Sequence, residues 1–322
     1  MPRILLTQRV HPVAQAGLAE LGEVLVAPDT AADTLRRLAA GCQVVVVRSP
    51  LPSDIFDAAP SLIGAVRHGA GVDMIPIDEA TAHGVLVANV PGVNANALAE
   101  HVLCSLLQLA RRSNAVRERL QGTRSAGWAA ARALADAGFE LAGRTLGVVG
   151  YGHAGQAIGR LCAQGFSMQV LAHTRSPLGA GAVATATRVP LDELLERSDF
   201  VVLACPLTAE TRGLIGAAQL ARMRRGAMLI NVARGPVVQE RALIEALQTG
   251  PLAAAALDVF DTQPLPDDHP FWSMPQVLIT PHVAGITQDS MLAMGQGATR
   301  AVAALLQGRV PPHCLNPQAA RR

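Results

Sequence analysis

Short runs of apolar, largely β-branched residues recur along the chain, and helical spacing of apolar positions fills the stretches between them. Nine of these runs predict strands, at residues 4–6, 44–47, 62–66, 85–87, 146–149, 170–172, 201–203, 228–230 and 277–279. Strands that alternate with helices are typical of a doubly wound parallel sheet. A single sheet averages about five or six strands, and the series is interrupted between residues 89 and 145. The pattern therefore predicts two α/β domains.

Two helices outside the strand series indicate how the domains connect. The apolar residues of segment 96–112 fall at helical spacing, and we expect this helix to lead from one domain to the other. A second helix is expected over residues 287–306, after the last strand, and it should pack back on the first domain. We therefore expect residues 1–96 and 288–322 to form one domain, with residues 97–287 inserted as the other.

The composition excludes several classes of enzyme and of binding surface. All 27 basic residues are arginines, because the sequence contains no lysine. A Walker-A phosphate loop and the Schiff-base enzymes, including those that use pyridoxal phosphate, both require a lysine, so both classes are excluded. The 25 acidic residues leave a formal net charge of +2 with no basic runs, which argues against a nucleic-acid or membrane surface.

Cysteine usage and the chain start indicate the compartment. The five cysteines form no CxxC pair, and their odd number fits free thiols in a reducing environment. The first ten residues lack the apolar stretch of a signal peptide, and no window approaches the roughly 20 apolar residues of a membrane-spanning helix. The histidines show no metal-site spacing. We therefore expect a cytoplasmic protein without a metal.

The clearest local motif is a glycine-rich loop that directly follows a predicted strand. Gly150, Gly152 and Gly155 form a GxGxxG pattern that includes His153 and Ala154 and runs into a helical pattern. In dinucleotide-binding loops, the first glycine makes a tight turn and the second lets the backbone approach a pyrophosphate. The third glycine allows close packing of helix on strand. This context favours a dinucleotide site over an ordinary glycine turn, and His153 could either touch a phosphate or face solvent.

The residues after the next strand indicate which dinucleotide binds. An NAD site usually has an acidic residue there, which binds the ribose 2′-hydroxyl. This chain has Thr174, Arg175 and Ser176 instead. An arginine is how a 2′-phosphate is accommodated, so the sequence favours NADP over NAD, the alternative being that Arg175 is a solvated loop residue.

Three later polar motifs each follow an apolar strand, at residues 231–238, 258–266 and 280–285. Open parallel sheets bind ligands at the carboxyl ends of their strands. A lone arginine or histidine in such a place is often structural. Three such motifs on one nucleotide-binding sheet instead predict a functional site.

Taken together, these motifs resemble the D-isomer-specific 2-hydroxyacid dehydrogenase family over nearly the whole chain. The further segments that carry the resemblance are 68–73, 90–94, 98–101 and 205–212. The resemblance implies a Rossmann-type cofactor domain inserted into a flavodoxin-like substrate domain, both of them doubly wound parallel sheets. It also implies a homodimer formed through the cofactor domains, and the weakly patterned segment 121–143 is a candidate for that contact.

The resemblance also implies residue roles. His282 is the expected acid/base, and Arg234 is expected to hold the substrate carboxylate and polarise its carbonyl. The backbone N–H groups of the loop Gly69, Ala70 and Gly71 are expected to bind the other side of the carboxylate. Asp258 matches the aspartate beside the nicotinamide amide. The remaining cofactor contacts implied are Cys205, Pro206, Thr211, Val232, Ala233, Arg234, His282 and Gly285.

One position departs from the family pattern. A glutamate that pairs with the histidine in the family is replaced here by Gln263, and neither Asp261 nor Asp267 stands at the matching position. Gln263 can accept a hydrogen bond from the imidazole, but it supplies no negative charge to favour imidazolium. We therefore expect an active enzyme whose His282 titrates at lower pH than with a glutamate partner.

The expected function is NAD(P)H-dependent reduction of a small 2-oxo acid, of the glyoxylate or hydroxypyruvate type, to the D-hydroxy acid. Two alternatives remain open. One is a non-catalytic NAD(H)-sensing binding protein of the co-repressor type. The missing glutamate would fit such a protein, because it would not need that residue for catalysis. The other is a formate dehydrogenase-like enzyme, which has a glutamine beside its histidine.

Overall fold

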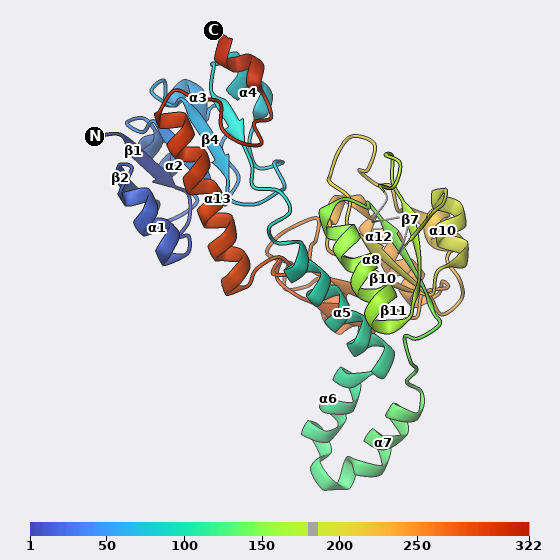
Figure 1. The fold of residues 1–322 in the computed structure, drawn as a ribbon. Coiled ribbons are helices and arrows are strands. Elements are labelled where there is room, and N and C mark those ends of the chain that lie inside the picture. The colour runs from blue at the N-terminus through green and yellow to red at the C-terminus, as the bar shows by residue number, and fades with distance from the viewer. Residues whose placement is uncertain (180–185, 322) are drawn as a thin grey trace. The chain divides into compact units, whose positions relative to one another are not determined.

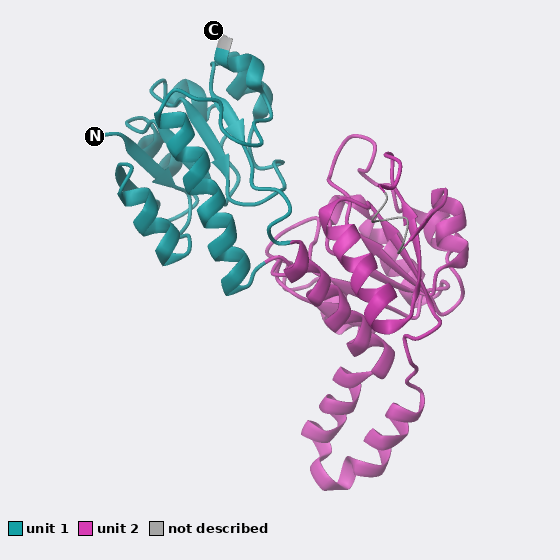
Figure 2. Cartoon of the chain, viewed as in Figure 1, with its two compact units in different colours: residues 1–94, 286–322 teal, residues 95–285 magenta. Residues whose placement is uncertain are grey.

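A computed structural model describes residues 1–179 and 186–321 of the chain. The chain forms two compact units, coloured separately in Figure 2. Unit 1 consists of Met1–Asn94 and Ile286–Arg322, and unit 2 of Ala95–Gly285. The second unit is thus inserted into the first, with both junctions two residues before the expected ones.

Unit 1 is a five-stranded, wholly parallel sheet in the order β2-β1-β3-β4-β5. This is the strand order of flavodoxin-like folds. Its strands are β1 (Arg3–Leu6), β2 (Glu23–Val26), β3 (Val44–Val47), β4 (Gly64–Arg67) and β5 (Leu86–Ala88). Its helices are α1 (Pro12–Ala19), α2 (Ala32–Ala39), α3 (Ile55–Ala58), α4 (Ile77–Ala82), α13 (Gln288–Leu306) and the 3-10 turn η4 (Pro317–Arg321).

Both faces of this sheet are buried, which explains why its strands read as continuous apolar runs. The four valines of β3 alternate between the faces: Val44 and Val46 pack with α1 and α13, whereas Val45 and Val47 pack with α2, α3 and α4. The C-terminal helix α13 therefore belongs to unit 1, as the sequence predicts (Figure 1).

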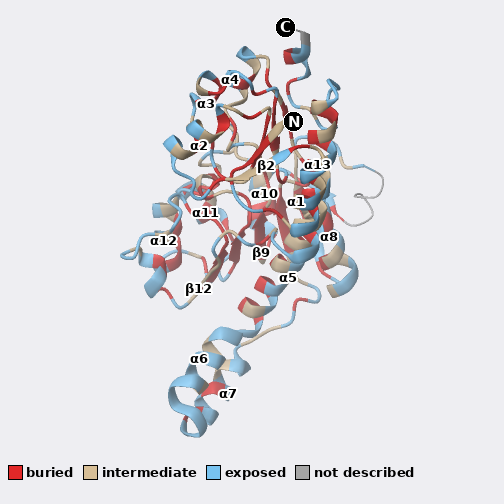
Figure 3. Cartoon of the chain, turned by 90° about the vertical axis from the view of Figure 1, so that its left-hand side faces the viewer, coloured by how far each residue is buried: buried red, intermediate tan, exposed pale blue. Residues whose placement is uncertain are grey.

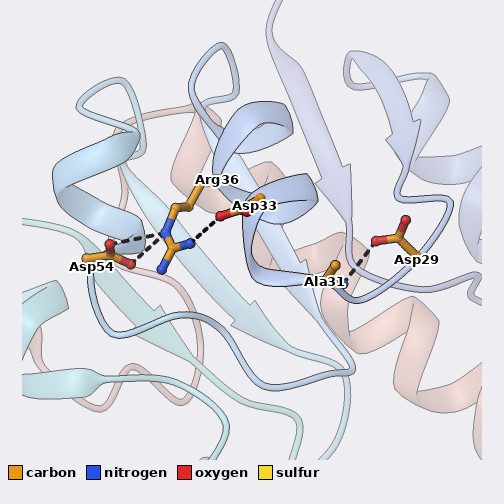
Figure 4. Close-up of polar contacts among 5 residues, drawn as sticks. All are labelled: Asp29, Ala31, Asp33, Arg36 and Asp54. Atoms are coloured by element: carbon orange, nitrogen blue, oxygen red, sulfur yellow. Dashed lines mark hydrogen bonds and ion pairs between the residues drawn. The ribbon is translucent and has the colours of Figure 1, made fainter.

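Charged contacts brace the outer layer of unit 1. The Arg36 guanidinium in α2 donates to both carboxylate oxygens of Asp54, at 2.9 and 3.1 Å, and to Asp33 at 2.7 Å (Figure 4). Asp29 accepts the N–H of Ala31 at 2.9 Å and so fixes the turn into the helix (Figure 4). The Arg36 hydrogen bond lowers the pKa of Asp54. These contacts hold α2 against the segment that precedes α3.

Unit 2 is a seven-stranded parallel sheet in the order β12-β11-β10-β9-β6-β7-β8. Counted from β6 as strand 1, this is the Rossmann order 3-2-1-4-5-6 with one strand added. The strands are β6 (Thr145–Val149), β7 (Gln169–His173), β8 (Thr187–Arg188), β9 (Phe200–Leu203), β10 (Met228–Asn231), β11 (Ala254–Leu257) and β12 (Val277–Ile279). Two parallel α/β units agree with the expected fold class.

Helices cover both faces of the second sheet as well. Helices α5 (Ala95–Arg111) and α8 (His153–Phe166) share one apolar cluster with it, and α10 (Leu191–Arg197), α11 (Ala217–Arg222) and α12 (Glu240–Gln248) share the other. Short 3-10 turns lie at η2 (Gly235–Val237) and η3 (Pro270–Ser273).

A helical hairpin follows α5 and has almost no core of its own. It comprises α6 (Ser113–Thr123), the 3-10 turn η1 (Arg124–Gly127) and α7 (Trp128–Asp136). No residue of α6 is buried, and Trp128 is 65% exposed. Figure 3 shows the hairpin mostly in the colour of exposed residues. This hairpin falls in the region from which we expected a subunit contact.

Within residues 1–179 and 186–321, no helix combines the length and apolar character needed to cross a membrane. The same part of the chain contains no group of three or more His, Cys, Asp or Glu residues placed to hold a metal ion.

Acid should destabilise the protein through His68, which follows β4. His68 is 2% exposed, and burial, reinforced by the charges of Arg48 and Arg67, lowers its pKa to about 4. The unfolded state keeps the ordinary pKa of about 6.5 and binds the proton first as pH falls. Stability due to neutral His68 is therefore present above about pH 6.5 and is lost toward pH 4, by roughly 3 kcal/mol. Thermal unfolding midpoints between pH 7.5 and 4.5 should fall less steeply in His68→Asn.

His83 provides the matched control, because its hydrogen bonds to the Glu79 carbonyl and to Asp57 raise its pKa. Its contribution is present at low pH and is lost as pH rises through the raised value, so His83→Asn should make the fall toward acid steeper. Parallel curves for wild type and His68→Asn would contradict this account of acid sensitivity.

Candidate active site

In unit 2 the predicted site segments all lie at one edge of the sheet. The strands are parallel, and each segment begins within three residues of a strand's carboxyl end, after β6, β7, β9, β10, β11 and β12. The chain reverses its direction of growth across the sheet at β6, and this switch point is where open α/β sheets bind ligands. The structure thus brings these motifs together along one edge.

The glycine loop after β6 has the geometry that a dinucleotide requires. Gly150 has a φ of 94°, and a Cβ there would lie 2.5 Å from the Cys205 nitrogen, so only glycine fits. A Cβ on Gly155 would lie 2.2 Å from the Gly150 carbonyl oxygen. A Cβ on Gly152, in contrast, would meet nothing within 4 Å. Gly150 and Gly155 are therefore required by the fold, whereas the space at Gly152 suits an approaching pyrophosphate.

Helix α8 starts at the end of this loop with its N-terminus available to an anion. Its N-cap is Gly152, which supplies no side-chain cap to the first-turn N–H groups. Such N–H groups and the helix dipole favour phosphate. His153 and Ala154 are the first two residues of the helix, and His153 is exposed.

The turn after β7 carries the predicted arginine together with a second one. Arg175 is exposed, and the Arg188 side chain donates to the backbone carbonyls of Thr174 and Arg175, each at 3.1 Å. Two guanidinium groups thus lie at the turn Thr174–Ser176, where the ribose of a dinucleotide is expected. The charge of Arg175 also contributes to a lowered pKa at Glu210, after the hydrogen bond from Thr208.

The loop after β9 is closed by one hydroxyl. Thr211 Oγ1 donates to the Pro206 carbonyl at 2.7 Å and accepts the Thr208 N–H at 2.8 Å. Cys205, at the start of the loop, is buried, and burial raises the pKa of its thiol. A neutral buried thiol suits a packing role, and the backbone of Cys205 lies directly against Gly150.

The turn that carries Arg234 is held by Asn231, the last residue of β10. The buried Asn231 side chain accepts the Ala233 N–H at 3.0 Å and donates to the Arg234 carbonyl at 3.1 Å. The Arg234 guanidinium donates to the Ala233 carbonyl at 2.7 Å. Val232 and Ala233 are buried, so this turn presents the half-buried arginine from a rigid base.

His282 and Gln263 meet as predicted. Nδ1 of His282 lies 3.0 Å from Oε1 of Gln263, whose Nε2 donates to the Phe260 carbonyl at 3.3 Å. Because Oε1 can only accept, Nδ1 of the imidazole carries the hydrogen. Nε2 is then the ring atom that gains or loses a proton. Asp261 lies instead near Glu240, and burial together with that charge raises its pKa.

One buried carboxylate fixes the loop that bears His282. Asp258, 3% exposed, accepts the Thr280 hydroxyl on Oδ1 at 2.6 Å and the Val283 N–H on the same oxygen at 2.9 Å. Its Oδ2 accepts the Ala284 N–H at 2.9 Å. The N–H of His282 donates to the backbone carbonyls of Asp258 and Thr280, at 2.8 and 3.1 Å. We call this arrangement of Asp258, Thr280 and the N–H groups they bind the Asp258 clamp.

The clamp holds a backbone conformation that is unfavourable in isolation. His282 has a φ of 57°, in the left-handed region, which costs a non-glycine residue about 1–2 kcal/mol. Such residues persist only where the surrounding contacts determine them, and they are concentrated at active sites. The strained residue here is the predicted acid/base.

In unit 1, the loop Gly69–Gly71 has its carbonyls occupied by donors of the same unit. The Gly69 carbonyl accepts the Val90 N–H, the Ala70 carbonyl accepts Nδ2 of Asn89 at 2.7 Å, and the Gly71 carbonyl accepts Nε of Arg67 at 2.8 Å. Gly69 donates its own N–H to the Arg67 carbonyl. The N–H groups of Ala70 and Gly71 have no hydrogen-bond partner within residues 1–179 and 186–321. Two free donors beside a guanidinium suit an anion.

Several supporting residues have no role in the sequence interpretation, namely Asn231, Thr280, Arg188, Arg67 and Asn89. Asn231 and Thr280 are polar residues at the carboxyl ends of β10 and β12, and that position is a usable sequence signal. The contacts of Arg188, Arg67 and Asn89 are with backbone atoms, which no residue pattern identifies.

Comparison with known proteins adds the family. Residues 103–284 match the model described as D-isomer specific 2-hydroxyacid dehydrogenase, NAD binding domain. The chain is 37% identical over 281 residues to a glyoxylate reductase of Korarchaeum cryptofilum, covering 85% of this chain and 82% of that one. It is 36% identical over 294 residues to glyoxylate/hydroxypyruvate reductase B of Salmonella typhimurium, covering 91% and 90%.

A solved structure is similar to nearly the whole chain. The NADPH-dependent glyoxylate/hydroxypyruvate reductase of Sinorhizobium meliloti, in complex with NADP and malonate, has a TM-score of 0.81 and 30% identity. The alignment covers 94% of this chain and 93% of that one.

Two alanine substitutions should separate the roles of the loop glycines. Gly152→Ala should leave the unfolding temperature within a few degrees of wild type, because its Cβ meets no protein atom, but it should weaken NADPH binding at least tenfold by occupying the pyrophosphate space. Gly155→Ala should lower the unfolding temperature itself, because its Cβ overlaps the Gly150 carbonyl. The measurements are thermal unfolding and fluorescence titration with NADPH. Unchanged NADPH affinity in Gly152→Ala would contradict the assignment of the loop.

Proposed function

Because the chain belongs to the D-isomer specific 2-hydroxyacid dehydrogenase family, we propose that it reduces a small 2-oxo acid to the D-2-hydroxy acid with a nicotinamide cofactor. It is an NAD(P)-dependent oxidoreductase. The substrate class follows from its relatives, which are reductases of glyoxylate and hydroxypyruvate. The observation that carries the proposal is His282, held in a strained backbone by the Asp258 clamp and oriented through Nδ1 by Gln263.

Reduction of a 2-oxo acid needs a hydride on the carbonyl carbon, a proton on its oxygen and a clamp on its carboxylate. The reduced nicotinamide supplies the hydride when it is bound. His282 supplies the proton from Nε2, since Gln263 accepts the hydrogen on Nδ1. Arg234 binds the carboxylate with a planar fork and polarises the carbonyl. The N–H groups of Ala70 and Gly71 bind the carboxylate as well, because neither donates to any other residue that the structure describes.

The residues at the edge of the unit 2 sheet fit the cofactor. The open space at Gly152 and the uncapped start of α8 suit the pyrophosphate, and the two guanidiniums at Thr174–Ser176 suit a ribose 2′-phosphate. We therefore favour NADPH over NADH. Pro206, Thr211, Val232, Ala233 and Gly285 remain proposed cofactor contacts, with Cys205 packing behind the glycine loop.

For Asp258 we propose a main task beyond the one that the family resemblance implies. Three of its acceptor positions are taken by the loop 280–284, so we propose that it chiefly positions His282. One position on Oδ2 remains, with which it could also accept a hydrogen from the nicotinamide amide.

We also propose that the protein is a cytoplasmic homodimer. The hairpin α6–α7 lacks a core and exposes Trp128, so it needs a partner surface to bury it. All five cysteines are free thiols, which suits a reducing compartment. Sedimentation at micromolar concentration should give a dimer, and Trp128→Asp should shift it toward monomer. A monomeric wild-type protein would overturn the dimer.

A panel of 2-oxo acids with NADPH and with NADH tests the main proposal. Glyoxylate or hydroxypyruvate should be reduced, with kcat/KM higher for NADPH than for NADH. Arg175→Gln should reduce that preference by weakening NADPH binding alone, because Arg188 remains at the turn. His282→Asn should lose about 100-fold or more in kcat while it still binds NADPH, because the proton donor is missing.

Two results of that panel would overturn the proposal. One is NADPH binding without turnover of any 2-oxo acid, as expected of a binding protein of the co-repressor type. The other is NAD reduction that depends on formate. Wild-type activity in His282→Asn would reject His282 as the proton donor.

Gln263→Glu tests the role of the missing charge. A carboxylate 3.0 Å from Nδ1 favours imidazolium and so raises the pKa of His282. The alkaline limb of kcat/KM for reduction should therefore move to higher pH, by about one unit or more. Gln263→Leu, which removes the acceptor without adding charge, separates orientation from charge, and it should lower kcat without moving the limb upward. An unmoved limb in Gln263→Glu would contradict the charge argument.

A further inference from the structure

We propose that Thr280 and His101 are positioning residues for the reduction, and that they act through Asp258 on the loop that presents His282. The inference rests on the proposed role of His282. It concerns a hydrogen-bond chain of three side chains, His101, Thr280 and Asp258, which lies behind the loop within unit 2 and connects α5 to the sheet edge.

The direction of each hydrogen bond in this chain is fixed by chemistry. Thr280 has one hydroxyl hydrogen, and at 2.6 Å it is donated to Oδ1 of Asp258, because a carboxylate only accepts. His101, in α5, has its Nε2 3.4 Å from the same hydroxyl oxygen. That oxygen can now only accept, so Nε2 of His101 is the donor. The hydrogen bonds are therefore donated from His101 to Thr280 and from Thr280 to Asp258.

This chain matters because the carboxylate has to be held in one orientation. Oδ1 accepts the Val283 N–H and Oδ2 accepts the Ala284 N–H. His282, with its left-handed backbone, directly precedes these two residues in the sequence. Without the Thr280 hydroxyl, Oδ1 keeps only the Val283 bond, and the carboxylate can tilt. A misplacement of about 1 Å at a catalytic group can cost 100-fold in rate.

The space behind the chain makes a clean experiment possible. A cavity of about 90 Å³ is lined by His101, Thr280 and Asp258, among others. A valine at 280 has nearly the shape of threonine and places a methyl where the hydroxyl is. Because the cavity leaves room beside it, Thr280→Val removes the hydrogen bond without overpacking. Thr280→Ser is the matched control, since it keeps the hydroxyl and loses the methyl.

The first measurement is steady-state reduction of glyoxylate together with NADPH titration. Thr280→Val should lose about 10- to 100-fold in kcat, and its Kd for NADPH should stay within about threefold of wild type. The affinity is largely retained because the proposed pyrophosphate and 2′-phosphate contacts follow β6 and β7, and β6 lies four strand spacings, about 19 Å, from β12. Thr280→Ser should keep at least a third of the wild-type kcat. Equal kcat in Thr280→Val and Thr280→Ser would overturn the inference.

The outer member of the chain is tested by a second pair. His101→Gln places an amide N–H that can still donate toward Thr280, whereas His101→Leu removes the donor. The leucine variant should lose several-fold more kcat than the glutamine variant, at similar unfolding temperatures. Equal loss in both would reduce His101 to a packing residue and would overturn its part of the proposal.

Amide hydrogen exchange gives a readout that does not depend on activity. In the protein without ligands, the peptide containing residues 281–285 should exchange about tenfold faster in Thr280→Val than in wild type or Thr280→Ser. Unchanged exchange would overturn the inference whatever the kinetics show. If Thr280→Val exchanges faster but the wild-type protein reduces no 2-oxo acid, the Asp258 clamp is upheld. Only the proposed function is then rejected.

Discussion

The buried carboxylate of Asp258 is the interaction on which the proposed chemistry depends. It stands at the end of β11 and binds three donors from the loop that follows β12, so the two neighbouring strands are tied together beyond their last ladder hydrogen bond. In return, the loop places His282 in a left-handed conformation that the residue would not adopt alone. Gln263 then orients the ring from a different segment, so the backbone and the imidazole are fixed independently.

The parallel sheet explains why so many short polar segments lie at the same edge of unit 2. Every strand of unit 2 ends at the same edge, and the helices that cover both faces leave that edge for ligands. For the proposed anionic ligands the chain offers three kinds of positive group: single arginines such as Arg234 and Arg175, the start of α8 in unit 2, and the N–H groups of Ala70 and Gly71 in unit 1. A chain without lysine thus has guanidiniums and oriented backbone N–H groups to offer to the proposed carboxylate and phosphate.

The sequence predicts the architecture well where the physics is local. Buried parallel strands are rich in β-branched apolar residues, so β3 and β6 can be predicted from the sequence. A dinucleotide loop needs glycines at fixed spacing, so the Gly150 loop can be predicted as well. The nine predicted runs do not include β2 or β8, and β11 is implied only as the apolar strand before the 258–266 motif. The alanines of β11 carry no β-branched signal, and β8 has only two residues, both exposed. The Asp258 clamp joins residues more than 20 positions apart, and no local pattern encodes such a bond.

Single-turnover reduction by Asp258→Asn tests the central claim most directly. If Asp258 is chiefly a clamp, the folded variant should bind NADPH within about threefold of wild type, yet transfer hydride to saturating glyoxylate about 100-fold more slowly, because His282 is misplaced. If Asp258 is chiefly a cofactor ligand, NADPH binding should weaken by tenfold or more while the rate at saturation remains near that of wild type. The second result would contradict the account.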